Sequence, residues 1–355
     1  MQRGETMNSI HRARGGLQAR AVTALRWLGT QEGVVLIINV LLALALALAS
    51  PVFLTRDNLL AGGVAMAAHA ITSMGTTLVL LTGGIDLSVG SSFGLAGVIM
   101  AETMCRGVPF WAAAALGIMV GVIIGWINGV VITKLEINPF IATMGTMTMA
   151  RGLVNVMTQS RSIRLPADCA YLVNTLIFGL PPSFVLMIAS VVVTDLLLRY
   201  WRPARQFFYI GGSREHARLI GINVDRLQIL AYVLSGALAA LSGLLFTLRS
   251  GSAHQQAGIE LNMKVILSPY LGGVGFMGGG SAFGAFLGAL LLGLIFNAIQ
   301  LLGIAVLWQN VLVGVLLLGA ALVGIFRMRR EMQRSRRERR LSRREAAIQP
   351  AEPGG

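Results

Sequence analysis

Long stretches without a charged residue limit the folds open to this chain more than any other feature. The longest extends from Val265 to Phe326, 62 residues that include no Asp, Glu, Lys or Arg. About 20 apolar residues in a helix cross the hydrocarbon core of a bilayer, so this run has room for two or three crossings. The other long uncharged runs are Gly33–Thr55, Leu59–Ile85, Pro109–Thr133, Cys169–Thr194 and Leu227–Leu248. We therefore predict an all-α, polytopic integral membrane protein.

Small residues recur at helical spacing inside these runs. Only 12% of the 355 residues are charged, whereas about a quarter are charged in a soluble protein. Small residues let membrane helices approach one another closely, which predicts helix-packing faces where they line up. Two such faces are made of Gly117, Gly121, Gly125 and Gly129, and of Ser235, Gly236, Ala239, Ala240 and Gly243.

Positive charge is concentrated at both ends of the chain and in one central connection. The net charge is +14, and ten arginines lie between Arg327 and Arg344 alone. Short connections rich in Lys and Arg stay on the cytoplasmic side of a membrane. The N-terminus, the C-terminus and the central connection are therefore predicted to be cytoplasmic. This placement explains the charge without a nucleic-acid partner, and none is predicted.

We predict about ten transmembrane helices in a membrane domain of residues 33–326. A basic cytoplasmic N-terminal segment, residues 1–32, precedes it, and an Arg-rich cytoplasmic tail, residues 327–355, follows it. Arg151 interrupts the fifth span, which is then short or re-entrant, with Arg151 near the membrane surface or paired inside the bundle. The predicted spans are Gly33–Ser50, Leu60–Thr82, Val89–Met104, Pro109–Thr133, Asn138–Leu153, Ser183–Leu198, Leu227–Leu248, a short Val265–Phe276, Ala282–Leu302 and Ile304–Phe326.

An aspartate lies at membrane depth in GGIDLSVGSSFGLAGV, residues Gly83–Val98. A charge at the centre of a membrane helix costs about 2.5–3.5 kcal/mol on insertion scales, so Asp86 should face protein or water. It can cap the next helix by accepting from the backbone N–H of Ser88 or Val89. It can also lie on a solute path, because broken helices often build transport sites, and the two roles are compatible. The predicted path residues are Asp86, Ser88, Ser91 and Asn138.

The central connection has the pattern of a docking helix. Its sequence, FFYIGGSREHARLIGINVDRL, covers residues Phe207–Leu227, and the docking helix is predicted at about 207–226. A Gly-Gly-Ser turn precedes a short helical pattern. A loop that only tethered the chain to anionic headgroups would not need the apolar residues of this pattern. Those residues are Ala217, Leu219, Ile220 and Ile222.

The common signatures of enzymes are missing from the sequence. It has no P-loop GxxxxGK[ST], no HExxH and no paired carboxylates, and its four histidines do not cluster. Two cysteines, Cys105 and Cys169, are too few for a disulfide framework or a metal site. His69, inside the second span, is either a proton relay or a neutral histidine bonded within the bundle. We predict a non-catalytic chain without a cofactor or metal of its own, driven by a partner.

Three motifs carry a family resemblance. TGGIDLSVGS (82–91), NPFIATMGTMTMARG (138–152) and GGSREHARLIGINVDRLQILAYVLSGALAALSGLL (211–245) resemble permease subunits of bacterial monosaccharide ABC importers of the ribose, xylose and galactoside type. Their superfamily also holds branched-chain amino-acid permeases. The similarity runs from about Leu59 to Phe326. It implies an inner-membrane permease that works as a homodimer or heterodimer with a second permease copy, two cytoplasmic ATPase subunits that bind the ATP, and a periplasmic solute-binding protein.

The resemblance also implies roles for single residues. It matches 211–223 to the coupling helix that fits into a groove on the ATPase, with contact positions Gly212, Glu215, Ala217, Gly221 and Asn223. One departure concerns SPYLGGVGFMGGGS (268–281), where relatives have a pattern like VLGGTSLFGGRGS. Pro269-Tyr270 is foreign to that pattern, and Gly280 stands where an Arg is common. The solute or the gate of this chain is therefore expected to differ from that of a standard ribose system.

The expected function is uptake of a monosaccharide or similar small polar solute by alternating access, driven by the partner ATPase. Three alternatives stay open at this point. One is an ABC permease for an amino acid, a polyol or a signalling molecule. Another is a secondary transporter or channel that needs no ATPase. The last is an intramembrane enzyme centred on Asp86.

Overall fold

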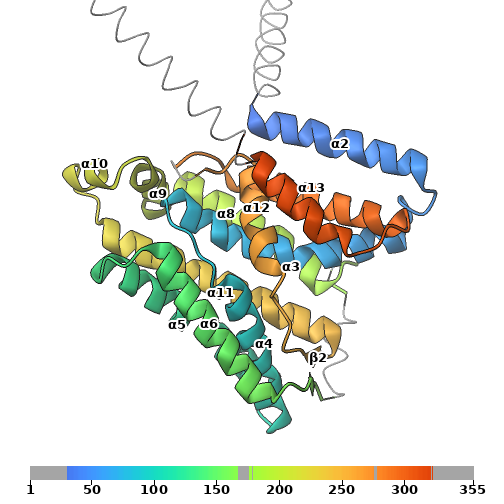
Figure 1. The fold of residues 1–355 in the computed structure, drawn as a ribbon, viewed down its shortest axis with the longest axis horizontal. Helices are drawn as coiled ribbons and strands as arrows, with labels where there is room; N and C mark the ends of the chain where they lie inside the picture. The colour runs from blue at the N-terminus through green and yellow to red at the C-terminus, as the bar shows by residue number, and fades with distance from the viewer. Residues whose placement is uncertain (1–29, 167–175, 178, 276–277, 321, 323–355) are drawn as a thin grey trace, which may run out of the picture.

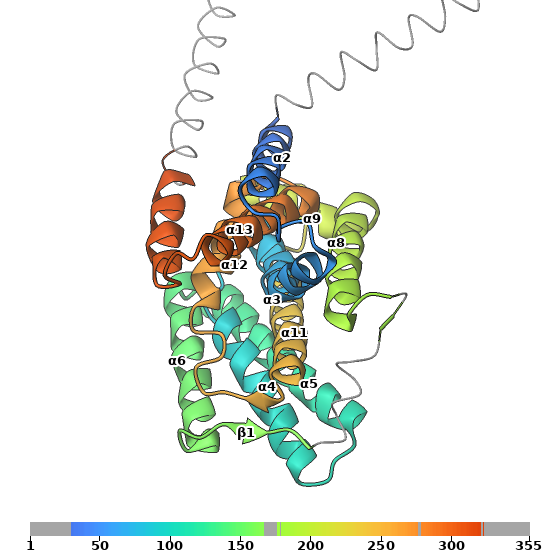
Figure 2. The ribbon, with the colours of Figure 1, turned by 90° about the vertical axis from the view of Figure 1, so that its right-hand side faces the viewer.

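The computed structural model describes residues 30–166, 176–177, 179–275, 278–320 and 322, and its secondary structure is almost entirely helical (Figures 1 and 2). Within this part of the chain, six helices are long and apolar enough to cross a membrane. They are α2 (Gln31–Ala49), α3 (Arg56–Leu81), α5 (Phe110–Lys134), α8 (Pro182–Tyr200), α11 (Val224–Ser250) and α13 (Ala282–Leu301). The other helices are α4 (Val89–Cys105), α6 (Pro139–Thr158), α9 (Arg202–Gly212), α10 (Arg214–Leu219), α12 (Leu261–Leu271) and Trp308–Ala320. The chain is thus the predicted polytopic membrane protein.

α11 is the central helix and packs against α3, α4 and α5. Its contact with α5 is backbone against backbone, because a Cβ added at Gly121 would collide with the carbonyl oxygen of Gly236, and one at Gly236 with that of Gly121. At Gly125 an added Cβ would meet the carbonyl oxygen of Tyr232. Close van der Waals packing of this kind holds membrane helices together. Both packing faces predicted from the small residues are confirmed.

The helical structure is interrupted between α3 and α4 in the middle of the bundle. α3 is buried continuously from Ala70 to Leu81 and ends at Thr82, and Gly83 follows with a φ of +73°. α4 resumes only at Val89. We call residues 82–88 the α3–α4 break; nearly all of it is buried. The predicted helix interruption is therefore present and lies inside protein.

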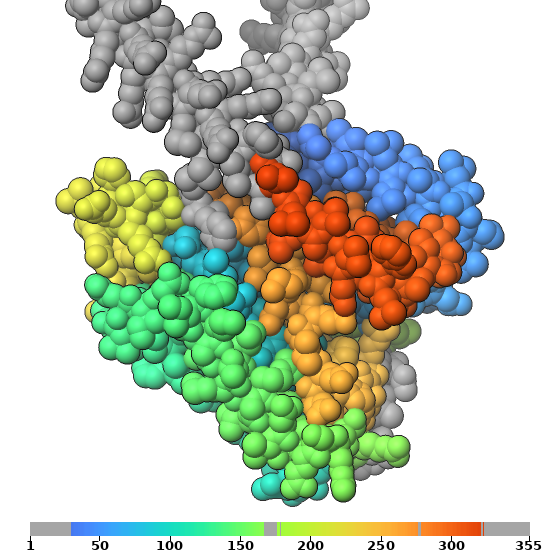
Figure 3. Space-filling view, viewed as in Figure 1, coloured from blue at the N-terminus to red at the C-terminus, as the bar shows by residue number. Residues whose placement is uncertain are grey.

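α9 and α10 form one end of the molecule, and the small strands β1 (Ile163–Arg164) and β2 (Ser252–Ala253) lie at the other (Figure 1). Phe207 and Ile210 anchor α9 in the core, beside the end of α3. Ser213 ends α9 and accepts a hydrogen bond from the N–H of His216 at 3.3 Å, which starts α10. In the space-filling view this segment (yellow) projects from the bundle (Figure 3).

Two predicted spans differ from the structure. α6 is a complete helix of 20 residues, and it continues past Leu153 because Arg151 is paired inside the protein. α12 starts at Leu261 and ends at Leu271, so the predicted span Val265–Phe276 is misplaced at both ends. Its 11 residues measure about 16 Å, too short to cross the bilayer core. The chain turns after α12 because Gly273 adopts a φ of +94°.

The predicted position of the eighth span is wrong because a charge lies inside α12. Hydropathy places Lys264 in an external connection, but the residue is buried in the first turns of this helix. Its ammonium pairs with Glu260 at 3.2 Å and lies 4.9 Å from the centre of the Phe296 ring, which lets a cation enter the bundle. Residues 1–29 of the predicted N-terminal segment 1–32, the predicted tail 327–355, the end of the span Ile304–Phe326, and Cys169 lie outside the described residues. The membrane helix α2 begins at Gln31, within the segment predicted to precede the membrane domain. Cys105 is exposed and free.

Candidate functional site

The α3–α4 break is built around the carboxylate of Asp86, which is 1% exposed. One oxygen, Oδ1, accepts from the Ser88 N–H at 2.9 Å and from the Ser88 hydroxyl at 2.6 Å. The other, Oδ2, accepts from the Ser235 hydroxyl of α11 at 2.9 Å. Asp86 therefore accepts the bond from the Ser88 N–H that the sequence suggested, and it also ties the break to α11. The N-cap residue of α4, however, is Ser88 and not Asp86.

The hydrogen bonds continue from the break to α5 and α6. The Asn128 amide donates to the Ser88 hydroxyl at 2.9 Å, and Asn128 Oδ1 accepts from the Thr146 hydroxyl at 2.7 Å. A continuous polar chain thus joins α11, the α3–α4 break, α5 and α6. We call it the polar chain; its members are Ser235, Asp86, Ser88, Asn128 and Thr146.

α11 also satisfies carbonyl groups of the break. The Tyr232 hydroxyl donates to the carbonyl oxygen of Ile85 at 3.1 Å, and the Gln228 amide donates to that of Thr82 at 3.3 Å. Irregular backbone at membrane depth is stable only when protein or water supplies its partners. The position of α11 is therefore fixed to the break by side-chain bonds as well as by packing.

The four predicted path residues do not form one cluster. Asp86 and Ser88 bond each other, and Ser91 is buried in the first turn of α4. Asn138 lies apart at the start of α6, where it is exposed and accepts from the N–H of Phe140 at 2.9 Å. Asp86 and Ser88 are engaged in structural bonds, so their role on a solute path stays a prediction.

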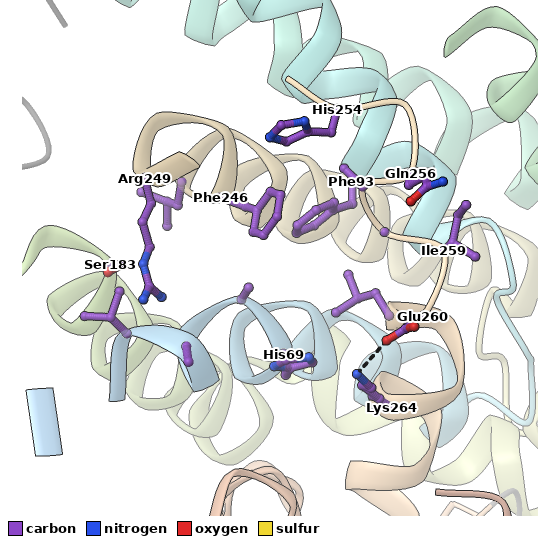
Figure 4. Close-up of a pocket in the computed structure, with 17 residues that line it drawn as sticks. His69, Phe93, Ser183, Phe246, Arg249, His254, Gln256, Ile259, Glu260 and Lys264 are labelled. Carbon is purple, nitrogen blue, oxygen red and sulfur yellow. Dashed lines mark hydrogen bonds and ion pairs between the residues drawn. The ribbon is translucent and has the colours of Figure 1, made fainter. Parts of the chain in front are cut away.

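A cavity of about 700 Å³ opens at the end of the bundle away from α10, and Figure 4 shows the residues that line it. α11 starts beside α10, and its last turn carries Arg249 into the cavity wall. The other walls come from α3, α4, the start of α12 and the connection 254–260. Figure 4 shows Phe93 and Phe246 on one side, with ring centres 5.3 Å apart, and His69, Glu260 and Lys264 on the other. We call this space the vestibule.

Almost nothing in the sequence pattern indicates the vestibule. His69 is the one lining residue that stands out in the sequence, but its neighbours come from four separate segments and only the fold brings them together. Glu260 and Lys264 form an ion pair in this wall, to which Arg249 adds a third charged group, and the side chain of Lys264 is 9% exposed against 61% for Glu260. The hydrogen bond from Lys264 holds the pKa of the Glu260 carboxyl below its usual value. Glu260 is thus an anion and an acceptor at neutral pH.

The structure divides the predicted docking residues into two groups. Ala217 is buried against the chain's own core, together with Ile222. Gly212, Glu215, Gly221 and Asn223 are exposed, and Asn223 caps α11 by accepting from the Arg226 N–H at 3.1 Å.

Two apolar residues outside the predicted contact positions point outward in residues 207–226, which we call the docking segment. Leu219 is 79% exposed and Ile220 65% exposed, at a turn that Gly221 makes with a φ of +82°. An exposed apolar pair on a segment otherwise rich in arginine is compatible with the predicted docking of a protein, which stays a prediction. The sequence places both in one apolar face with Ala217 and Ile222, but the structure splits that face: Ala217 and Ile222 pack into the core, and Leu219 and Ile220 face outward.

Known proteins are similar in sequence to this chain along most of its length. Residues 58–321 match the family model described as "Branched-chain amino acid transport system / permease component". The chain is 37% identical to a probable ABC transporter permease protein, y4mJ, of Sinorhizobium fredii, over 93% of this chain and 97% of the relative. It is 33% identical to the ribose import permease protein RbsC of Haemophilus influenzae, over 80% and 90%. It is 35% identical to the autoinducer 2 import system permease protein LsrC of Yersinia pestis, over 75% and 76%.

Proposed function

The chain belongs to the family of permease components of branched-chain amino acid transport systems, and from this we propose that it imports a monosaccharide or a similar small polar solute. It is a multi-pass membrane permease of an ABC importer and a non-catalytic component of that system. The sugar assignment is supported by the relative named for ribose import. The relative named for autoinducer 2 import supports a second candidate, a small signalling molecule.

The observation that carries the mechanism is the docking segment with its exposed Leu219 and Ile220. A cytoplasmic ATPase subunit docks there and binds the ATP, so this chain needs no cofactor of its own. α10 leads within a few residues into α11, which holds the α3–α4 break through Ser235. Movement of α10 is passed on to α11 and from there to the polar chain. ATPase state and pore state are then coupled reciprocally.

The assembly we propose contains two permease copies in the inner membrane and a periplasmic solute-binding protein. The N- and C-termini and α10 face the cytoplasm, and about ten helices make up the membrane domain. The vestibule then lies on the periplasmic side, where the binding protein delivers the solute. Recognition of the solute is shared with that protein, and the transport step involves no chemistry on the solute.

Uptake by the reconstituted complex tests this proposal. The permease, the ATPase subunit and the binding protein encoded beside it are assembled in proteoliposomes with ATP inside. Labelled D-ribose, D-xylose, D-galactose, L-leucine and autoinducer 2 are then offered in turn. We expect ATP-dependent uptake of one of the sugars and co-purification of the ATPase. Uptake without an ATPase would identify a secondary transporter, and uptake of leucine or autoinducer 2 alone would refute the sugar assignment.

A further inference from the structure

We propose that the vestibule is a solute-binding site inside each chain, shaped for one uncharged, polyhydroxylated ring of monosaccharide size. This inference rests on the proposed function and adds to it a place and a set of residues. The cavity of about 700 Å³ falls within the range of small-molecule sites, roughly 300–1,000 Å³. It therefore has room for such a ring together with several water molecules.

An aromatic wall lines one side of the vestibule. Phe93 from α4 and Phe246 from α11 lie with ring centres 5.3 Å apart and planes tilted by 48°. Ligand sites combine such apolar walls with a few placed polar groups. The C–H face of a sugar ring is apolar and fits against this wall, while its hydroxyls are left to find partners opposite.

The opposite side offers a charged donor and acceptor pair, and Arg249 adds a cationic donor at the α11 end of the vestibule. Lys264 and Glu260 form one donor and acceptor pair, 3.2 Å apart, and His69 lies beside them, whereas Gln256 lies near Phe93 (Figure 4). An uncharged polyol can hydrogen-bond to the pair without separating it.

The connection 254–260, which completes the wall of the vestibule, is held in place by hydrogen bonds to other parts of the chain. Arg151 of α6 donates to the carbonyl oxygens of Gln255 at 2.7 Å and Ala257 at 3.0 Å. His254 bonds through one ring nitrogen to the Ser162 hydroxyl at 2.9 Å and through the other to the Ser252 hydroxyl at 3.0 Å. The wall is therefore fixed before a solute arrives, which lowers the ordering cost of binding.

Two substitutions of Phe246 test the site in the full complex with its ATPase and binding protein. Phe246→Trp fills part of the vestibule and Phe246→Ala removes the wall. Each should raise the half-saturating concentration for the sugar taken up by the wild type at least fivefold. Phe283→Ala, a partly exposed phenylalanine on α13, is the matched control and should leave uptake unchanged. Uptake by both Phe246 variants at the wild-type half-saturation would overturn the inference.

Labelling of a single cysteine in the vestibule provides a second test that does not depend on the folding of the Phe246 variants. Gln256→Cys is introduced with Cys105→Ser and Cys169→Ser and treated from outside with a charged methanethiosulfonate reagent. We expect modification to block uptake, and the sugar-loaded binding protein to slow the labelling. Full uptake after complete labelling would also overturn the inference. Absence of uptake of any of the sugars by the wild-type complex is a different result, because it refutes the proposed function itself.

Discussion

Asp86 offers the most direct test of how this bundle is held together. Replacing it with Leu leaves three buried donors without their acceptor: the Ser88 N–H, the Ser88 hydroxyl and the Ser235 hydroxyl. Each unsatisfied buried donor costs about 1–3 kcal/mol, which gives about 3–9 kcal/mol for the three. At roughly 2 °C per kcal/mol, the unfolding midpoint should fall by about 6–18 °C. Asp86→Asn keeps one acceptor oxygen for Ser88 and should lose about a third as much.

The assay is thermal unfolding of the purified complex in nanodiscs, followed by tryptophan fluorescence, with uptake measured in parallel. Asp195→Leu is the matched control, because that carboxylate pairs with the exposed Arg199 on α8. Such surface pairs contribute about 0–1 kcal/mol, so its midpoint should shift by about 2 °C at most. If Asp86→Leu unfolded within about 1 °C of the wild type but no longer transported solute, Asp86 would act on the solute path, and its assignment as a structural cap would be wrong.

The docking segment, the helix contacts and the vestibule each lead to a further prediction. Gly221→Trp should abolish uptake and the stimulation of the ATPase while leaving the binding-protein affinity intact. Gly107→Trp, at a similar positive φ in another loop, is the control and should change neither uptake nor ATPase stimulation. Normal uptake by the Gly221 variant would refute docking at α10. Gly236→Leu should prevent stable assembly, measured as the yield of monodisperse protein, because its Cβ would collide with a backbone carbonyl of α5. The Lys264 bond lowers the Glu260 pKa below 4.5, so stability from this pair is fully present above pH 4.5 and is lost as pH falls through the lowered pKa. The midpoint difference between wild type and Glu260→Gln should therefore shrink only in strong acid, and a difference that vanished near pH 6 would contradict this.

Features decided by local sequence pattern could be predicted. The glycine spacing around Gly121 places α5 against another helix, because only small residues at that period allow backbone contact. The aspartate beside Gly83-Gly84 predicts a capped break, since a carboxylate at membrane depth needs donors close by. In both cases the physical requirement is met within a few residues of the signal.

Features that depend on distant partners could not be predicted. Arg151 is ambiguous in the sequence because its acceptors are carbonyl groups 104 and 106 residues later in the chain. Hydropathy places Lys264 outside the bundle, since it shows neither the pairing with Glu260 in a buried helix nor the Phe296 ring beneath the ammonium. The vestibule combines five separate stretches of the sequence, so no single stretch carries its pattern.

The uninterrupted length of α11 has a consequence for how a signal could cross the membrane. Its 27 residues make a stiff rod about 40 Å long, with the docking segment at one end and the aromatic wall near the other. A swing of about 5° around the Asn223 end carries the Arg249 end through about 3.5 Å, close to the diameter of one methyl group. A lever of this kind converts a small rotation in one compartment into a change of aperture in the other, without any hinge between the two.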